Sequence, residues 1–210
     1  MQTEVLVIPQ PRGRAQDALP GGSLFVLPTG NDPAAALAWP RDCGDWPDET
    51  LWLPRADAEG NERYLQLIPY ALLRNGSGDL WCYRRHGGDQ RLRECFSCGV
   101  GGHVDREDED VTLRATVWNT LLRELGEELN WQPPPEPIEP VAWIYEGLSP
   151  IGRVHLGLLY LLDWHDEEPP RAVDPALADI GFRSAADILA EPRFELWSRL
   201  AARYVSGESR

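Results

Sequence analysis

The strongest signal in the chain is the stretch Arg123-Glu124-Leu125-Gly126-Glu127-Glu128-Leu129-Asn130-Trp131. It places three glutamates at relative positions i, i+3 and i+4, which share one face of a helix. Each such pair of like charges costs a few tenths of a kcal/mol, a cost that a bound cation would remove. Hard divalent ions such as Mg²⁺ prefer oxygen ligands. The stretch therefore predicts a site for Mg²⁺, or for Mn²⁺ in its place, formed by Glu124, Glu127 and Glu128. The alternative is a solvated acidic helix face.

The helix that carries these glutamates is expected to run from about Thr112 to Leu129. Thr112 or Asp110 can cap its first turn, and Asn130 can take the left-handed conformation that ends a helix. Its apolar side chains recur at helical spacing and leave the glutamates largely off the buried stripe, which consists of Val117, Leu121, Leu122, Leu125 and Leu129.

Strand patterns lie on both sides of this helix. The runs Tyr64–Arg74 and Leu80–Arg85 are separated by Asn-Gly-Ser-Gly, a strong turn signal, and so predict a β-hairpin. A third run, Cys95–Val100, leads into Gly101-Gly102-His103. After the helix, two strands are expected at Val141–Tyr145 and Val154–Leu162, and two helices at Ala185–Ala190, capped by Ser184, and at Arg193–Val205. The mixture of strands and helices is typical of an α+β fold.

The first 60 residues are rich in Pro and Gly, with short apolar runs at Val5–Ile8 and Leu24–Leu27 that could be strands. They also contain Trp39, Trp46 and Trp52, too many large aromatics for a disordered tail. We therefore expect an N-terminal extension over residues 1–60 that packs on a main domain over residues 61–210.

Composition limits the function classes. The formal net charge of −14 argues against binding to a nucleic-acid polymer, whose phosphates attract basic surfaces. The sequence shows neither a secretory signal nor a stretch of about 18 apolar residues, so a cytoplasmic protein without a membrane span is expected. The Cys95-Phe-Ser-Cys98 pair lacks a matching second pair, so buried free thiols are favoured over a zinc site.

The acidic stretch and its surroundings resemble the Nudix hydrolases, whose motif carries Arg-Glu-x-x-Glu-Glu on a helix that follows a Gly and a loop. Gly102 precedes the helix here. Further segments resemble a bacterial subgroup of Nudix-like proteins described as predicted phosphoesterases: Gln66–Tyr70, Tyr83–Arg85, Gly99–His103 and Arg153–Gly157. The resemblance covers about Tyr64 to Tyr204 and implies an α/β/α sandwich with a mixed β-sheet.

The resemblance also implies an activity, the Mg²⁺-dependent hydrolysis of a pyrophosphate bond in a nucleoside diphosphate linked to another group. Glu124 and Glu127 would then be catalytic, with Arg123 orienting them. Glu124, Glu127, Glu128 and the carbonyl of Gly102 would hold metal. The partner would be a small phosphorylated, nucleotide-containing substrate, and a homodimer stays open. Candidates for substrate contact are Arg84, Arg85, His103 and His155, whose alternatives are solvated arginines and structural or core histidines. Glu146 and Glu168 lie in loops where some family members carry an extra base or ligand.

Two departures from the family motif leave other functions open. The position eight residues before Arg123, where the family has a Glu that supports the Arg, is Ala115. The spacing from the Gly to the Arg is also about seven residues longer, consistent with an insertion across residues 105–112. Glu107, Asp108, Glu109 or Asp110 could replace the missing Glu. The alternative function is therefore an inactive Nudix-fold module that binds a nucleotide or joins an assembly. An isomerase would need a proton-transfer pair that the sequence does not reveal.

Overall fold

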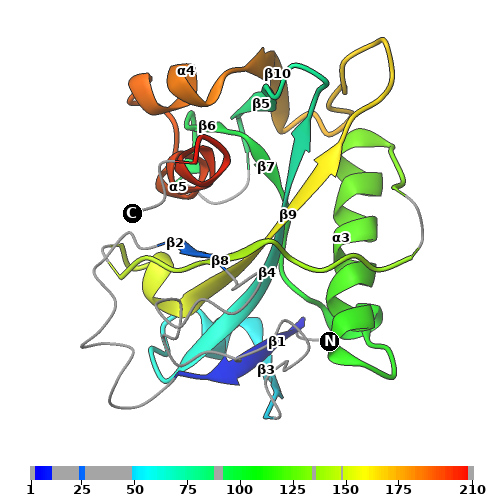
Figure 1. Cartoon of the computed structure of the whole chain (residues 1–210). Coiled ribbons are helices and arrows are strands. Elements are labelled where there is room, and N and C mark those ends of the chain that lie inside the picture. Colours follow the sequence, from blue (N-terminus) through cyan, green and yellow to red (C-terminus); the bar gives the residue numbers. More distant parts are fainter. Residues whose placement is uncertain are drawn as a thin grey trace, which may run out of the picture.

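The structure is a computed structural model that describes residues 3–10, 24–26, 49–87, 92–133, 136–147 and 149–207. Trp39, Cys43, Trp46 and most of the Pro- and Gly-rich segments of the predicted extension lie outside these ranges. Figure 1 shows the described elements arranged around one twisted sheet.

The elements are the following. The strands are β1 (Glu4–Pro9), β2 (Leu24–Val26), β3 (Leu51–Pro54), β4 (Tyr64–Arg74), β5 (Leu80–Arg85), β6 (Phe96–Ser97), β7 (Gly99–Val100), β8 (Ala142–Ile144), β9 (His155–Asp163) and β10 (Leu177–Arg183). The helices are α2 (Arg55–Ala58), α3 (Leu113–Leu129), α4 (Ala185–Ala190) and α5 (Leu196–Val205), with 3₁₀ turns η3 (Arg106–Asp108) and η4 (Gly152–Val154). None of the described helices is long and apolar enough to cross a membrane.

The sheet is mixed, as predicted. Its central strands β4 and β9 run parallel, in register from Gln66↔His155 to Arg74↔Asp163, and the remaining pairs are antiparallel. The main order is β10-β5-β4-β9-β8-β2, with β1 beside the first part of β4 and β3 beside β1. Strands β1 and β3, which come from the predicted extension, thus hydrogen-bond into the same sheet as the main domain. The division at residue 60 stays a prediction.

Helices cover both faces of the sheet, which confirms the α/β/α sandwich (Figure 1). Alternation along β4 sends Leu65 and Leu67 toward α3, whose Leu121 and Leu125 are fully buried there. The opposite face carries Tyr70 and Leu72 and packs against α4 and α5. Helix α3 thus packs on the sheet through its apolar side chains, and Glu127 on its acidic face is exposed to solvent.

The predicted hairpin and helices are confirmed, but the run Cys95–Val100 is not one strand. It forms two short strands, β6 on β5 and β7 on β4, because β4 and β5 diverge after their single registered pair Arg74↔Leu80. Cys98 lies between them, and its backbone N–H donates to Ser198 Oγ (2.9 Å) instead of to a strand. Buried free thiols are confirmed for Cys82 and Cys98, while Cys95 is free and half-buried.

Three elements were missed by pattern reading. Strand β10 has a mixed polar sequence and a bulge at Gly181, where φ is +85°, so neither alternation nor a continuous apolar run marks it. Strand β3 and the single turn α2 are too short to show a period. Helix α5 also begins three residues later than predicted, at Leu196, because Phe96 and Phe194 form a bridge that keeps the preceding residues extended.

Helix α3 has the predicted caps. The Thr112 side chain accepts a hydrogen bond from the Ala115 N–H at 3.2 Å. Asn130 is left-handed (φ 50°, ψ 38°), and its N–H donates to the Gly126 carbonyl at 2.9 Å. The N–H of Trp131 donates back to the Leu125 carbonyl at 3.3 Å, so the last carbonyls of the helix are satisfied by a left-handed end. The caps fix where the acidic face begins and ends.

The left-handed residue gives a first prediction. Asn130→Ala should lower the free energy of unfolding by about 1 kcal/mol, because a Cβ disfavours this conformation, which Asn tolerates better than Ala. Asn130→Gly should leave stability unchanged or raise it by a few tenths of a kcal/mol. Urea unfolding of the two variants tests this. Equal stability of Asn130→Ala and wild type would show that the cap conformation carries no strain.

Candidate active site

The site is built where the loop that follows β7 crosses the second half of α3. Gly101 passes so close to the Pro69 carbonyl that no Cβ would fit there. Gly102 lies next to the Glu124 carboxylate, and a Cβ at this position would overlap it. Gly101 therefore allows the loop to lie directly on β4, and Gly102 allows it to approach Glu124 of α3.

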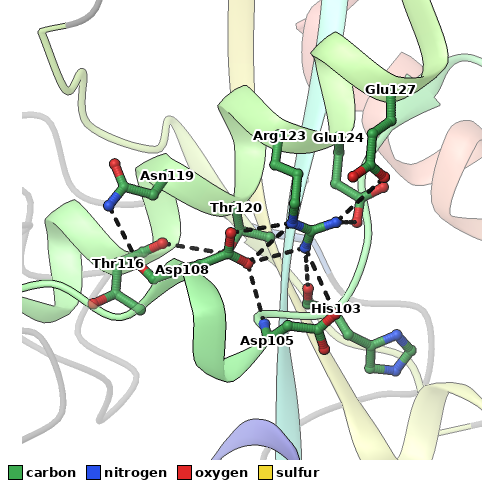
Figure 2. Close-up of polar contacts among 9 residues, drawn as sticks. All are labelled: His103, Asp105, Asp108, Thr116, Asn119, Thr120, Arg123, Glu124 and Glu127. Carbon is green, nitrogen blue, oxygen red and sulfur yellow. Dashed lines mark hydrogen bonds and ion pairs between the residues drawn. The ribbon is translucent and has the colours of Figure 1, made fainter. Parts of the chain in front are cut away.

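Arg123 is the centre of the polar contacts, and Figure 2 shows its guanidinium between the loop and the helix. Its Nε and Nη2 donate to Asp108 Oδ1 and Oδ2 at 3.1 and 2.9 Å, a bidentate pair. Nη2 also donates to the His103 carbonyl (3.1 Å), and Nη1 to Glu124 Oε1 (2.8 Å). Burial lowers the pKa of Arg123, but these acidic partners outweigh it and raise that pKa above its usual value. The guanidinium is thus a permanent cation that fixes the loop to the helix.

Asp108 supplies the carboxylate that the sequence lacks at Ala115. It is 6% exposed, lies on η3, and accepts from Thr120 Oγ1 (2.9 Å) and from the Asp105 N–H (3.2 Å) as well as from Arg123. The other three candidates lie elsewhere. Glu109 accepts from Trp52 Nε1, Asp110 accepts from Asn119 Nδ2, and Glu107 is exposed. The insertion therefore carries the supporting residue within itself.

Glu124 and Glu127 both approach the same guanidinium nitrogen, Arg123 Nη1 (Figure 2). The Glu124 side chain is 14% exposed, and burial raises its pKa against the opposing effect of Arg123. Glu127 is 61% exposed and lies 3.5 Å from Arg123 Nη1, the i,i+4 partner that the spacing predicts. One carboxylate is thus held by the protein, and the other is available to solvent or to a ligand.

Glu128 is the unusual member of the three. Its Oε2 is buried and has no hydrogen-bond partner within the described part of the chain. Burial raises the pKa of Glu128 to about 8, with Arg85 opposing the shift and Glu124 adding to it. A buried carboxylate without a donor is costly, and such a group needs a proton or a cation.

The three carboxylates do not already form a closed ligand cage. Over residues 49–87, 92–133, 136–147 and 149–207, the sole group of three ligand atoms within 4.8 Å of one another lies elsewhere, at Glu59, His103 and His155. Glu124 and Glu127 both lie near Arg123 Nη1, at 2.8 and 3.5 Å, whereas Glu128 Oε2 is buried, so an ion held by all three would have to draw them together.

The buried carboxylate gives a second prediction. The unfolded chain ionises Glu128 near pH 4.5, whereas the folded protein keeps its proton up to about pH 8, so stability should fall as the pH rises through this window. Above pH 8, Glu128→Gln should therefore be more stable than wild type by about 4 kcal/mol, and the two should be equal near pH 4. Urea unfolding with a chelator present measures this. Glu127→Gln is the matched control, and the same pH profile in both variants would contradict the assignment.

The two arginines proposed for substrate contact face different surroundings. Arg84 is exposed, with Nη2 3.0 Å from His86 Nε2 and Nη1 4.0 Å from Glu94. Arg85 points inward and donates to Ser97 Oγ (3.1 Å) and to Tyr83 Oη (2.7 Å). The positive charge of Arg85 also lowers the pKa of Glu128, against the larger effect of burial, which raises it. Arg85 therefore acts on the site electrostatically.

His103 and His155 meet each other. Their Nε2 atoms are 3.1 Å apart, and the His155 Nδ1–H donates to the Ile151 carbonyl at 2.7 Å. Glu146 is buried in a loop, where it accepts from the backbone N–H and the hydroxyl of Ser149. Glu168 is exposed and lies 3.5 Å from Arg171.

Known structures share this architecture. Tm1382, a candidate Nudix hydrolase, superposes with a TM-score of 0.69 and 19% identity over 98% of this chain and 99% of its own. The NUDIX domain of Shewanella oneidensis NrtR, solved with ADP ribose, gives a TM-score of 0.52 and 17% identity over 70% of this chain and 89% of its own. The chain has the Nudix fold.

The similarity found by sequence comparison covers a smaller part of the chain than the structural similarity does. Protein YmaB of Bacillus subtilis (strain 168) is 31% identical over 111 residues, which are 51% of this chain and 53% of YmaB. The match thus spans about half the length of that relative. No family model matches the chain.

The sequence did not identify two sets of residues at this site. One set holds Arg123 in place, and the other lies around His103. Asp105 and Thr120 support Asp108, and Glu59 lies 4.0 Å from His103 Nε2. The length of the insertion was the one available signal for Asp108, since an added acidic turn before the helix has to lie near it. Nothing in the sequence around Glu59 sets it apart from other surface carboxylates.

Proposed function

We propose that this Nudix-fold chain is a metal-dependent hydrolase that cleaves a pyrophosphate bond in a nucleoside diphosphate linked to another group. The observation that carries the proposal is the buried Glu128 Oε2, which lacks a hydrogen-bond partner within the described ranges and shares a helix face with Glu124 and Glu127. A site that keeps an uncompensated carboxylate is built for a cation.

The residues present fit Mg²⁺, or Mn²⁺ in its place. Glu124, Glu127 and Glu128 offer carboxylate oxygens, and Gly102 brings a backbone carbonyl to the same place because it has no Cβ to overlap Glu124. Such an ion neutralises phosphate charge and makes a bound water a better nucleophile.

The protein side chains divide the remaining work. Arg123, fixed by Asp108, holds Glu124 at 2.8 Å and so sets the position of that carboxylate. Glu127 is exposed enough to meet substrate or to accept a proton from the attacking water, and Glu124 is the other candidate for that role. Arg84 can pair with substrate phosphate from its exposed position. Arg85, His103 and His155 would contact substrate only through neighbouring groups or after rearrangement.

The inactive-module alternative rested on Ala115. It loses that support because Asp108 gives Arg123 a bidentate carboxylate partner from another part of the chain. The inactive binding module is therefore one outcome of the substrate experiment.

The test is incubation of the chain, with Mg²⁺ or Mn²⁺, with nucleoside diphosphate sugars, dinucleotide polyphosphates and oxidised nucleotides. ADP-ribose belongs in this panel because it is bound by the NrtR domain of the same fold. Metal-dependent release of a nucleoside monophosphate or of pyrophosphate supports the proposal. Nucleotide binding without turnover supports the binding module.

A further inference from the structure

A second group of metal-ligand atoms lies beside the carboxylate site and is not used by the proposed hydrolysis. It consists of Glu59 at the end of α2, His103 in the loop after β7, and His155 at the start of β9. One ligand atom from each residue lies within 4.8 Å of the other two. Three segments that are distant in sequence thus present two imidazoles and a carboxylate to one point.

The two imidazoles have the separation that a tetrahedral ion requires. Their Nε2 atoms are 3.1 Å apart, and the rings are inclined by 69°. Two nitrogens that each lie 2.0–2.1 Å from a tetrahedral zinc are about 3.3 Å apart. An ion could therefore enter between the rings with a shift of a few tenths of an ångström.

The hydrogen bond at His155 Nδ1 determines which ring nitrogen can bind a metal ion. Because Nδ1–H donates to the Ile151 carbonyl (2.7 Å), the neutral ring carries its lone pair on Nε2, the atom that faces His103. A backbone carbonyl that accepts from the other ring nitrogen is the usual support of a metal-bound histidine.

Glu59 completes the set with an oxygen. Its Oε1 is 4.0 Å from His103 Nε2, and its side chain, 31% exposed, lies at a helix end where it can adjust. It also lies 3.5 Å from Arg55. Nitrogen ligands favour Zn²⁺ and similar transition ions over Mg²⁺, and two histidines with one glutamate form a known three-ligand zinc set.

We propose that Glu59, His103 and His155 form a site for a transition-metal ion of the Zn²⁺ type, separate from the carboxylates of α3. Figure 2 shows the His103 imidazole extending away from the Arg123 guanidinium, while its carbonyl accepts from Nη2. The ion would tie α2, the glycine loop and β9 together and keep a fourth position for water or a ligand. The competing arrangement is a hydrogen bond from His103 Nε2–H to His155 Nε2.

The test titrates the chelator-treated full chain with Zn²⁺ by calorimetry in excess Mg²⁺, which occupies hard oxygen sites. The expected result is saturable binding of about one ion per chain that weakens by at least ~10²-fold in His103→Ala and in His155→Ala. Co²⁺ should give the intense visible absorption of a four-coordinate site. His165→Ala, which removes an exposed histidine, is the matched control and should bind as wild type does.

Two results would overturn the site: wild-type protein that takes up no Zn²⁺ under these conditions, or His103→Ala and His155→Ala variants that bind it as tightly as wild type. If the histidine variants do not fold, Glu59→Gln decides, because this half-buried residue can be changed without opening the core. Unchanged Zn²⁺ affinity and an unchanged Co²⁺ spectrum in Glu59→Gln would then exclude the three-ligand site. None of these measurements uses hydrolysis. The metal site can therefore be confirmed even if the proposed hydrolase activity is absent.

Discussion

Glu127→Gln is expected to lower the rate of pyrophosphate hydrolysis by ~10²-fold or more, the loss expected when a charged contact to the transition state is removed. Glu127 is the cleanest site for the change because its side chain is 61% exposed and its nearest cation, Arg123 Nη1, is 3.5 Å away. The substitution keeps the size of the side chain and removes its charge, so folding should be unaffected.

Glu128→Gln is expected to lower the rate of hydrolysis by a similar factor. Unlike Glu127→Gln, it should also change the stability of the protein. The variant should be more stable than wild type in the absence of metal, as argued from its buried Oε2. A variant that gains stability while losing activity is the signature of a group retained for function. A fall in kcat at saturating substrate would place the lost contact in the transition state, whereas a rise in KM alone would assign it to ground-state binding.

Glu107→Gln is the matched control for both changes, because it neutralises an exposed glutamate one residue from Asp108. Its rate should stay within about twofold of wild type, since a lone exposed charge contributes little. If Glu127→Gln and Glu128→Gln keep full activity on a substrate that the wild type hydrolyses, the acidic face of α3 is not the active site.

Asp108→Ala should be the most destabilising of these changes. It removes the bidentate partner of a guanidinium that is itself only 20% exposed, and it also removes the acceptor of the Thr120 hydroxyl. Breaking such a pair from one side should cost about 3 kcal/mol in the free energy of unfolding. Hydrolysis should fall as well, because Arg123 would no longer hold Glu124 in place. Urea unfolding and steady-state kinetics measure the two effects.

Two further variants sharpen this test. Asp108→Asn keeps an acceptor for Thr120 and should lose less stability than Asp108→Ala. Adding Ala115→Glu to Asp108→Ala should not restore either property, because Ala115 lies inside α3, about 12 Å along the helix axis from Arg123. Full rescue by this second change, or wild-type stability in Asp108→Ala, would show that Asp108 is not the support of Arg123.

Much of the fold follows from local pattern. The hairpin of β4 and β5 is marked by two apolar runs around Asn-Gly-Ser-Gly, and α3 is marked by a 3.6-residue period with Thr112 and Asn130 at its ends. These signals depend on neighbours within a few residues. Strand β10 could not be predicted, since its pairing with β5 comes from packing at the sheet edge and its own sequence is mixed.

The sequence by itself determined that Glu124, Glu127 and Glu128 share one face of a capped helix, because helical periodicity fixes which side chains point the same way. Only the tertiary structure decided that Asp108, 15 residues from Arg123, replaces the carboxylate missing at Ala115. It also decided that Glu128 Oε2 is buried without a hydrogen-bond partner among the described residues, and that Glu59, His103 and His155 converge. These features depend on how segments that are distant in sequence pack together. Such contacts produce no periodic pattern in the local sequence.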